Sequence, residues 1–411
     1  MKHKMVYFFV MLVVFCLTFS LWKAKAPKRP KLNLHVGSFS ELPGWKQVDA
    51  RTSLLAFQIS CTAFLKQNPE KLVGSDVVNL KALDWQPACV DAQSLKNPSR
   101  SAAKAFFEKW FLPVEFVQGK RLQGLFTGYY MPRLKGSLKK SKKYHVPLYG
   151  LPTNLVTVDL SLFDPNLKHR PLVGRVEDGK LLPYYTRAEI NLGLIKDAAP
   201  VVAWVDNTID RSFLEIQGSG IIDLKGGGEL VVGYIAANGQ PYTAIAKVLI
   251  NKGVMTLENA SMQHIRRYLE ANPSQIDQVL NENKSFVFFN ALKQNAALGS
   301  QGVVLTPGYS LAVDKQWVPL GTPIWLSTTH PDEITDENKV LQRLMIAQDT
   351  GGAIKGKVRG DVYWGAGDTA TAIAGKMKNM GHYWMLLPVR TLNKSYVPEP
   401  NPNPPSVEPN I

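Results

Sequence analysis

Three aspartates lie close together in a glycine-rich stretch towards the C-terminal end of the chain: Asp349, Asp361 and Asp368. The apolar residues 344–347 predict a strand that delivers Asp349 at its C-terminal end, and the neighbouring glycines would let a bulky ligand approach the backbone. The apolar residues 362–364 follow Asp361 directly. Such surroundings disfavour the ionised carboxylate and raise its pKa, as general-acid chemistry requires. The pattern indicates acid–base chemistry on a large ligand, with simple turn-forming aspartates as the alternative.

Other kinds of catalytic site have little support in the sequence. The seven histidines are scattered, and neither an H-E-x-x-H nor a C-x-x-C motif is present, so we expect no metal site. No G-x-S-x-G elbow and no phosphate-binding glycine loop follows a predicted strand, because the glycine-rich residues 218–220 and 226–228 lack the required spacing. The sequence therefore argues against serine hydrolases and nucleotide-dependent enzymes, and we expect no cofactor.

Charge and the N-terminal residues restrict the partners. The 411 residues include 48 Lys and Arg against 33 Asp and Glu, a net charge of +15 that favours anionic partners. Lys2 and Lys4 precede the uncharged residues 5–22, which predict an export signal or a membrane anchor. We favour an uncleaved anchor, with a cleaved signal or lipid attachment at Cys16 as alternatives. Export argues against a nucleic-acid partner.

The two remaining cysteines, Cys61 and Cys89, would then lie in a compartment that permits disulfides. We expect a disulfide between them, with two buried free thiols as the alternative.

Hydrophobic periodicity predicts a mixed chain that is mainly β. Apolar residues at helical spacing predict helices from residue 52 or 53 to 68, over 101–111 and over 242–252. Prolines divide the middle of the chain into short strands and turns. Strand-like segments then follow at residues 302–305, 310–313, 322–326, 341–347 and 382–389, before the proline-rich tail 396–411.

Six motifs occur in order along the chain. They are FTGYY at 126–130, TRAEI at 186–190, IQGSG at 216–220, NGQPY at 238–242, SFVFF at 285–289 and the aspartate segment 347–368. Together they resemble the membrane-bound lytic murein transglycosylase A family of bacterial cell-wall enzymes. The resemblance runs from Gly44 to about Pro388.

This resemblance implies a mainly β fold with peripheral helices. A double-psi β-barrel domain would carry a smaller inserted β domain, with a substrate groove between the two. The boundaries that follow are residues 1–30 for the membrane anchor or signal, 31–131 for the N-terminal part of the barrel, 132–284 for the insert, 285–395 for the three-aspartate part of the barrel and 396–411 for the tail.

The resemblance also implies cleavage of the β-1,4 bond between N-acetylmuramic acid and N-acetylglucosamine without water, leaving 1,6-anhydro ends. Because the nucleophile would be the muramyl C6 hydroxyl, one carboxyl could serve first as acid and then as base. Asp361 matches the acid/base of the family, Asp349 an aspartate that organises the site, and Asp368 a supporting hydrogen-bonding residue. Substrate contacts are expected from Thr127, Gly128, Tyr129, Gln217, Ser219, Gly220, Asn238 and Tyr242, with the amide of Gln217 exposed.

Two other functions stay open at this point. One is a hydrolytic muramidase on the same barrel, in which Asp349 activates water. The other is a catalytically silent peptidoglycan-binding protein of the envelope. In each case we expect glycan strands of peptidoglycan as the partner, membrane contact through the N-terminal segment, and a place on the periplasmic side of a bacterial cell envelope. Proteins of wall synthesis or division are further candidate partners.

Overall fold

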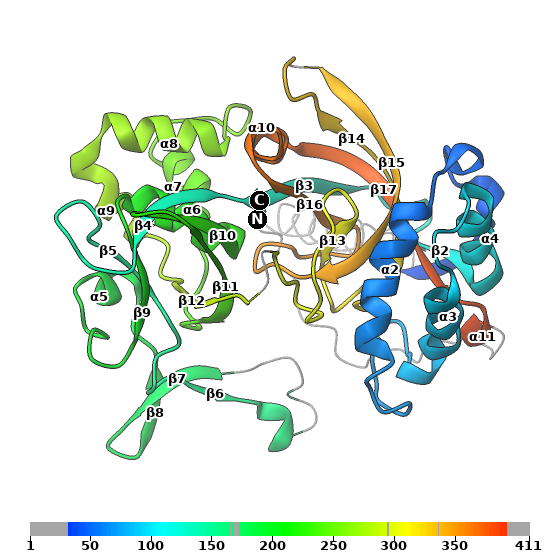
Figure 1. Cartoon of the computed structure of the whole chain (residues 1–411), viewed down its shortest axis with the longest axis horizontal. Helices are drawn as coiled ribbons and strands as arrows, with labels where there is room; N and C mark the ends of the chain where they lie inside the picture. The colour runs from blue at the N-terminus through cyan, green and yellow to red at the C-terminus, as the bar shows by residue number, and fades with distance from the viewer. Residues whose placement is uncertain (1–31, 165–166, 168–171, 294–295, 336, 393–411) are drawn as a thin grey trace, which may run out of the picture.

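The computed structural model describes residues 32–164, 167, 172–293, 296–335 and 337–392 (Figure 1). The predicted anchor or signal segment with Cys16 and the proline-rich tail lie outside these residues. Across the described ranges, no helix combines the length and the hydrophobicity needed to cross a bilayer.

Six strands pair in a closed ring, which is compatible with the predicted barrel. Strand β3 pairs in parallel with β16 and antiparallel with β17, so the hydrogen bonds return to the strand from which they started. In ring order the strands are β17 (Lys378–Pro388), β14 (Pro323–Pro331), β15 (Asn338–Asp349), β13 (Ser310–Val313), β16 (Arg359–Ala366) and β3 (Gly124–Met131). Strands β2 (Phe111–Val117) and β1 (Asn33–Val36) extend the sheet from β17.

Helices from the N-terminal part of the chain cover one side of this ring (Figure 1). They are α2 (Arg51–Phe64), α3 (Ala82–Ser94) and α4 (Arg100–Trp110). Helix α2 ends earlier than predicted, and α3 was missed because Pro87 interrupts its sequence. The helices share an aromatic core, in which Phe64 stacks on Trp85 with 5.1 Å between ring centroids.

Helix α2 also holds the strand that ends in Asp349. The Ser53 hydroxyl donates to Leu344 O at 2.8 Å. The fully buried Gln348 donates its side-chain amide to Ala56 O and to Ser60 Oγ, each at 2.9 Å. These bonds fix the C-terminal end of β15 against the helix, and a residue there is positioned by both elements.

A second sheet forms the inserted domain. Its strand order is β12-β11-β10-β4-β9-β5, and β3 leads into it directly through Pro132 (Figure 1). The bounds are β4 (Arg133–Ser137), β5 (Val146–Tyr149), β9 (Val201–Val205), β10 (Ser219–Leu224), β11 (Glu229–Ala237) and β12 (Val287–Ala291). A separate three-stranded sheet projects from the domain, with β6 (Val156–Val158), β7 (Leu172–Glu177) and β8 (Lys180–Pro183).

Helices pack on the inserted sheet and on the barrel. In the insert they are α5 (Arg187–Asn191), α6 (Thr208–Gln217), α7 (Ile245–Asn251), α8 (Met262–Ala271) and α9 (Ile276–Asn281). Helix α10 (Asp368–Lys376) lies against β3 and β16, and α11 (Val389–Leu392) follows β17.

Two expectations about strands are corrected. The domain boundary after residue 284 placed the Phe286–Phe289 motif in the barrel, whereas β12 pairs antiparallel with β11 and completes the inserted sheet. The predicted strand at residues 302–305 is absent, because Val304 makes only an isolated bridge with Leu298. A β-like sequence needs a neighbouring strand in register, which a local pattern does not supply.

Cys61 on α2 and Cys89 on α3 form a disulfide that closes a loop with a sequence separation of 28 residues. Replacing both by alanine releases this loop in the unfolded chain, and we expect the free energy of unfolding to fall by about 3 to 4 kcal/mol. Denaturant unfolding of the variant, beside the wild-type protein with and without reductant, measures the change. Equal stability of all three samples would contradict a stabilising disulfide.

Candidate active site

The barrel brings two of the three predicted aspartates to the same place. Strand β13 lies between β15 and β16, and its residue Ala312 is in register with Asp349 on one side and with Asp361 on the other. Adjacent strands lie about 4.8 Å apart, so the two backbones flank a single residue of β13. Burial is the main cause of the raised pKa of Asp361, and the nearby charge of Asp349 adds to the rise.

Asp361 is half-buried and has one strong hydrogen bond. It is in register with Thr127 of β3, whose hydroxyl donates to Asp361 Oδ1 at 2.5 Å. Among the described residues, no donor bonds Oδ2. Burial raises the pKa of this carboxyl above its usual value, while the charge of Arg359 and the bond from Thr127 oppose the rise. The site therefore holds a carboxyl group whose pKa is raised by burial and whose second oxygen has no bonded donor among the described residues.

Arg359 acts on Asp361 through its nearby charge, and it also bonds to the Thr127 hydroxyl. Its Nη2 donates to Thr127 Oγ1 at 2.8 Å, and the same hydroxyl donates onward to Asp361. Arg359 and Asp361 are two residues apart on β16 and thus share a face of the strand. A direct guanidinium–carboxylate pair would lower the carboxyl pKa strongly. The intervening hydroxyl keeps the positive charge near without forming that pair.

Asp349 is held much more tightly. Its Oδ1 accepts from Ser300 N and Ser300 Oγ at 2.9 Å each and from Thr350 N at 2.8 Å. Its Oδ2 accepts from the Tyr129 hydroxyl at 2.8 Å. Burial raises the pKa of Asp349, and these four bonds oppose the rise. Burial and the adjacent Asp349 also raise the pKa of Tyr129, so this phenol stays protonated and donates.

Asp368 lies apart from this pair. It is the first residue of α10 and is exposed, and no hydrogen bond joins it to Asp349 or Asp361. A carboxylate in the first turn of a helix interacts favourably with the helix dipole. Its supporting role in a reaction stays a prediction. Across the part of the chain that the structure describes, no group of three or more His, Cys, Asp and Glu side chains is arranged to hold a metal ion.

Comparison with known proteins finds two family matches, of which the first covers the insert together with strand β3 of the barrel. Residues 125–290 match the family described as the MltA specific insert domain, and residues 309–387 match the 3D domain. The crystal structure of MltA from Neisseria gonorrhoeae is 32% identical, covers 87% of this chain and 93% of its own, and superposes with a TM-score of 0.72. The chain belongs to the MltA family.

Other relatives agree with this membership. The crystal structure of a membrane-bound lytic murein transglycosylase from Agrobacterium tumefaciens has a TM-score of 0.77 at 28% identity, covering 88% of this chain and 99% of its own. The membrane-bound lytic murein transglycosylase A of Escherichia coli K12 is 33% identical over 264 residues, which are 64% of this chain and 65% of the relative. A homologue from Buchnera aphidicola is 33% identical over 267 residues, 63% and 65% of the two chains. The matched segment thus spans just under two thirds of these two curated relatives.

Three of the predicted substrate contacts in this MltA-family chain lie at the junction of barrel and insert. The expectation of an exposed Gln217 amide is wrong, because the residue is 8% exposed and its Oε1 accepts from Tyr130 N at 2.9 Å. Ser219 is buried beside it. A Cβ on Gly220 would lie 2.9 Å from Pro132 O, so this glycine allows the insert to approach the strand that leaves the barrel. At these positions the motif IQGSG joins the domains.

Close packing likewise explains why a glycine occupies position 128. A Cβ there would lie 2.8 Å from the Trp364 ring and 2.9 Å from Ala374 Cα, so the glycine lets α10 lie close to β3. Thr127 and Tyr129, on either side of it, carry the hydrogen bonds to Asp361 and Asp349. Tyr242, in the loop before α7, is 42% exposed and open to solvent. Direct contacts of these residues with substrate stay predictions.

The prediction that Asn238 contacts substrate is wrong. It is fully buried, and its Nδ2 donates to Tyr185 O at 2.8 Å and to Lys284 O at 2.9 Å. Its Oδ1 accepts from Phe286 N at 2.9 Å and from Gln240 N at 3.3 Å. The side-chain amide is saturated by backbone groups of the insert, so it holds three loops together and presents nothing to a ligand.

Sequence reasoning missed Arg359 and Ser300. Arg359 lies inside the aspartate segment, two residues before Asp361. If a strand is predicted there, this spacing places both side chains on the same face, which is the signal that could have identified Arg359. Ser300 lies 49 residues before Asp349 in a loop with no strand or helix pattern. No local signal connects the two, and only the fold brings them together.

The corrected role of Asn238 is tested by Asn238→Leu. The substitution removes the hydrogen bonds of the buried amide to four backbone groups, of which Lys284 O keeps its bond from Arg187 N, and we expect the free energy of unfolding to fall by about 3 kcal/mol. Because the side chain does not reach the surface, KM for a glycan substrate should stay within about twofold under conditions where the variant is folded. Denaturant unfolding and steady-state kinetics measure both quantities. A raised KM with unchanged stability would restore Asn238 as a substrate contact.

Proposed function

We propose that this protein is a lytic transglycosylase of peptidoglycan, which cleaves the β-1,4 bond between N-acetylmuramic acid and N-acetylglucosamine and leaves 1,6-anhydro ends. The observation that carries the proposal is the unequal bonding of the two carboxylates. Asp361 has a raised pKa and a free oxygen, whereas both oxygens of Asp349 are occupied within the protein. One available carboxyl suits a reaction whose nucleophile is part of the substrate.

In this reaction Asp361 works twice. Its protonated carboxyl donates a proton to the glycosidic oxygen as the bond from that oxygen to the muramyl anomeric carbon breaks, and the N-acetylglucosamine portion leaves with a hydroxyl. The resulting carboxylate takes the proton of the muramyl C6 hydroxyl, and the C6 oxygen bonds to the anomeric carbon. The proton returns to Asp361, and no water is consumed. Raising the pKa of the carboxyl by burial favours the first step.

The hydrogen bonds of Asp349 favour a positioning role over that of a base. Hydrolysis needs a second carboxylate that activates water or attacks the sugar. Three donors point at Asp349 Oδ1 and one at Oδ2, and each of these bonds lowers the basicity of the carboxylate. In our proposal Asp349 keeps Tyr129 and the loop at Ser300 in place beside Asp361. A muramidase reaction through Asp349 is the alternative that the product analysis below separates.

The substrate and the location follow from the same proposal. We infer that the protein acts on peptidoglycan in the bacterial cell envelope, on the periplasmic side, with the N-terminal segment as its attachment or export signal. The names of its relatives, lytic murein transglycosylases, support the substrate class. The net charge of +15 suits a polymer whose peptide stems carry free carboxylates. Binding to sacculi should accordingly weaken at high ionic strength.

Products released from purified sacculi identify the reaction. The wild-type protein should release muropeptides one water molecule lighter than their hydrolysed counterparts, as mass spectrometry would show. Asp361→Asn keeps the shape of the side chain but removes its titratable proton, and should lower the rate by at least about 100-fold. Reducing ends would instead identify a hydrolase, and binding of the wild type without any product would leave a non-catalytic wall protein.

The pH dependence of the rate tests the bond between Thr127 and Asp361. This bond lowers the pKa of Asp361, so Thr127→Val should raise that pKa. Because the acid must be protonated, activity falls as the pH rises through its pKa, and the alkaline limb of the pH–rate profile should move to higher pH. Thr127→Ser retains the hydroxyl and should keep the wild-type limb. An unchanged limb in Thr127→Val would contradict Asp361 as the acid.

A further inference from the structure

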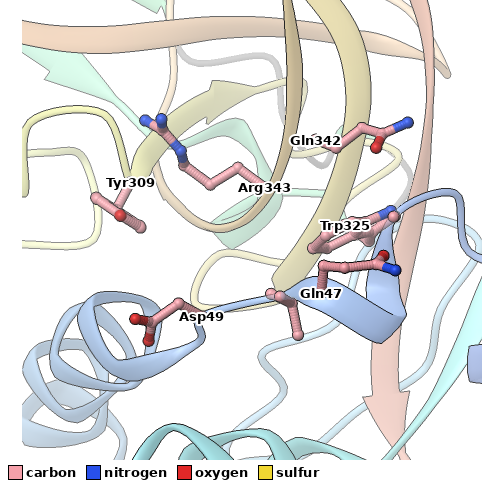
Figure 2. Close-up of a pocket in the computed structure, with 8 residues that line it drawn as sticks. Gln47, Asp49, Tyr309, Trp325, Gln342 and Arg343 are labelled. Atoms are coloured by element: carbon pink, nitrogen blue, oxygen red, sulfur yellow. The ribbon is translucent and has the colours of Figure 1, made fainter.

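A pocket of about 280 Å³ lies between the residues that lead into α2 and strands β14 and β15 (Figure 2). It contains none of the carboxylates described above. Pockets for drug-sized ligands begin at about 300 Å³, so this one suits a smaller group. Its walls are mostly polar and carry a guanidinium, a phenol and two amides, from Arg343, Tyr309, Gln47 and Gln342.

Arg343 is prepared to bind an anion. Its Nη1 donates to Gly308 O at 3.0 Å, and its guanidinium lies 4.9 Å from the centre of the Tyr309 ring. These two contacts orient the group, while Nε and Nη2 have no bonded partner among the described residues. No described carboxylate forms an ion pair with it. An oriented guanidinium with two adjacent free donors matches the geometry of a carboxylate.

The one carboxylate of the pocket does not neutralise Arg343. Asp49 accepts from Arg51 Nε at 2.9 Å and from Arg51 Nη2 at 2.6 Å. This pairing lowers the pKa of Asp49 to about 2 and cancels its charge locally, and Arg100 adds a further positive charge. The field in the pocket is therefore positive. The exposed amides of Gln47 and Gln342 offer both donors and acceptors to a peptide group.

Strand β13 connects this pocket with the carboxylates. Tyr309 directly precedes β13, and Ala312, three residues later, is the residue that Asp349 and Asp361 flank. Three residues of a strand span about 10 Å. An extended peptide spans at most about 3.5 Å per residue, so a chain of three or four residues attached to a sugar beside Asp361 has the length to reach Tyr309.

We propose that this pocket binds the peptide stem that peptidoglycan carries on its muramyl residues, with Arg343 as the partner of a stem carboxylate. The inference rests on the proposed function and deepens it. The pocket adds affinity for strands that carry peptide stems beyond the affinity for the bare glycan. Arg343 acts in binding and stands apart from the proton transfers at Asp361.

Two substrates test the assignment. One is glycan strands with their peptide stems, and the other is the same strands after an amidase has removed the stems. For the full-length protein with Arg343→Gln, KM for the peptide-bearing strands should rise about tenfold, which is the loss of one charge-assisted bond. Its kcat and its KM for the stripped strands should remain within about twofold of wild type. Arg267→Gln removes the same charge from an exposed position of α8 and should change neither.

A binding measurement complements the kinetics. Calorimetric titration with a free stem tetrapeptide should show binding to the wild type and to Arg267→Gln, and at least tenfold weaker binding to Arg343→Gln. Equal binding to all three proteins would overturn the assignment of the pocket to the peptide stem. A KM of Arg343→Gln that changes equally on both substrates would do the same. The absence of cleavage of either substrate by the wild type would overturn the proposed function instead, so the two failures are distinguishable.

Discussion

The parallel pairing of β3 with β16 is the constraint on which the site depends. It places Thr127 opposite Asp361 and Tyr129 opposite Tyr363, and it closes the ring of six strands because β3 also pairs with β17. In this ring β3 alone comes from the chain before the insert. A shift of one residue along β3 would turn both side chains to the opposite face. The same register of β3 against β16 thus closes the barrel and places the Thr127 hydroxyl beside Asp361.

Asp349 and Asp361 are both half-buried in the same site but differ in their hydrogen bonding. Burial raises the pKa of both, and each would be costly to ionise without compensation. Asp349 is compensated by four donors from three residues, which fixes its position and uses its lone pairs. Asp361 is compensated less, by the nearby charge of Arg359 and by one hydrogen bond, which comes from Thr127. The number of donors, rather than burial, separates the two residues, and in our proposal the one with fewer donors exchanges the proton.

The insert is joined to the barrel by small residues and buried amides. Strand β3 passes into the insert through Pro132, whose carbonyl lies against Gly220, and Gln217 bonds to the backbone of Tyr130. The residues nearest the carboxylates pack directly on the insert, since Tyr129 and Tyr363 share a cluster with Val231 of β11. The predicted groove along this seam stays a prediction. Tyr129 therefore contacts the insert on one side and donates a hydrogen bond to Asp349 on the other.

Local sequence was enough to predict helices α2 and α4, strands β13, β14, β15 and β17, and the grouping of chemistry around the aspartate segment, because hydrophobic spacing and glycine content are local properties. It also indicated the Cys61–Cys89 disulfide, since only two cysteines follow the N-terminal segment. It did not separate Asn238 and Gln217, which are buried and satisfied, from residues that face a ligand, because burial depends on segments more than 40 residues away. The bonds from Ser300 to Asp349 and from Thr127 to Asp361 join residues 49 and 234 positions apart. Which carboxylate is fixed and which is free was therefore decided by the tertiary structure alone, because the donors come from distant parts of the chain.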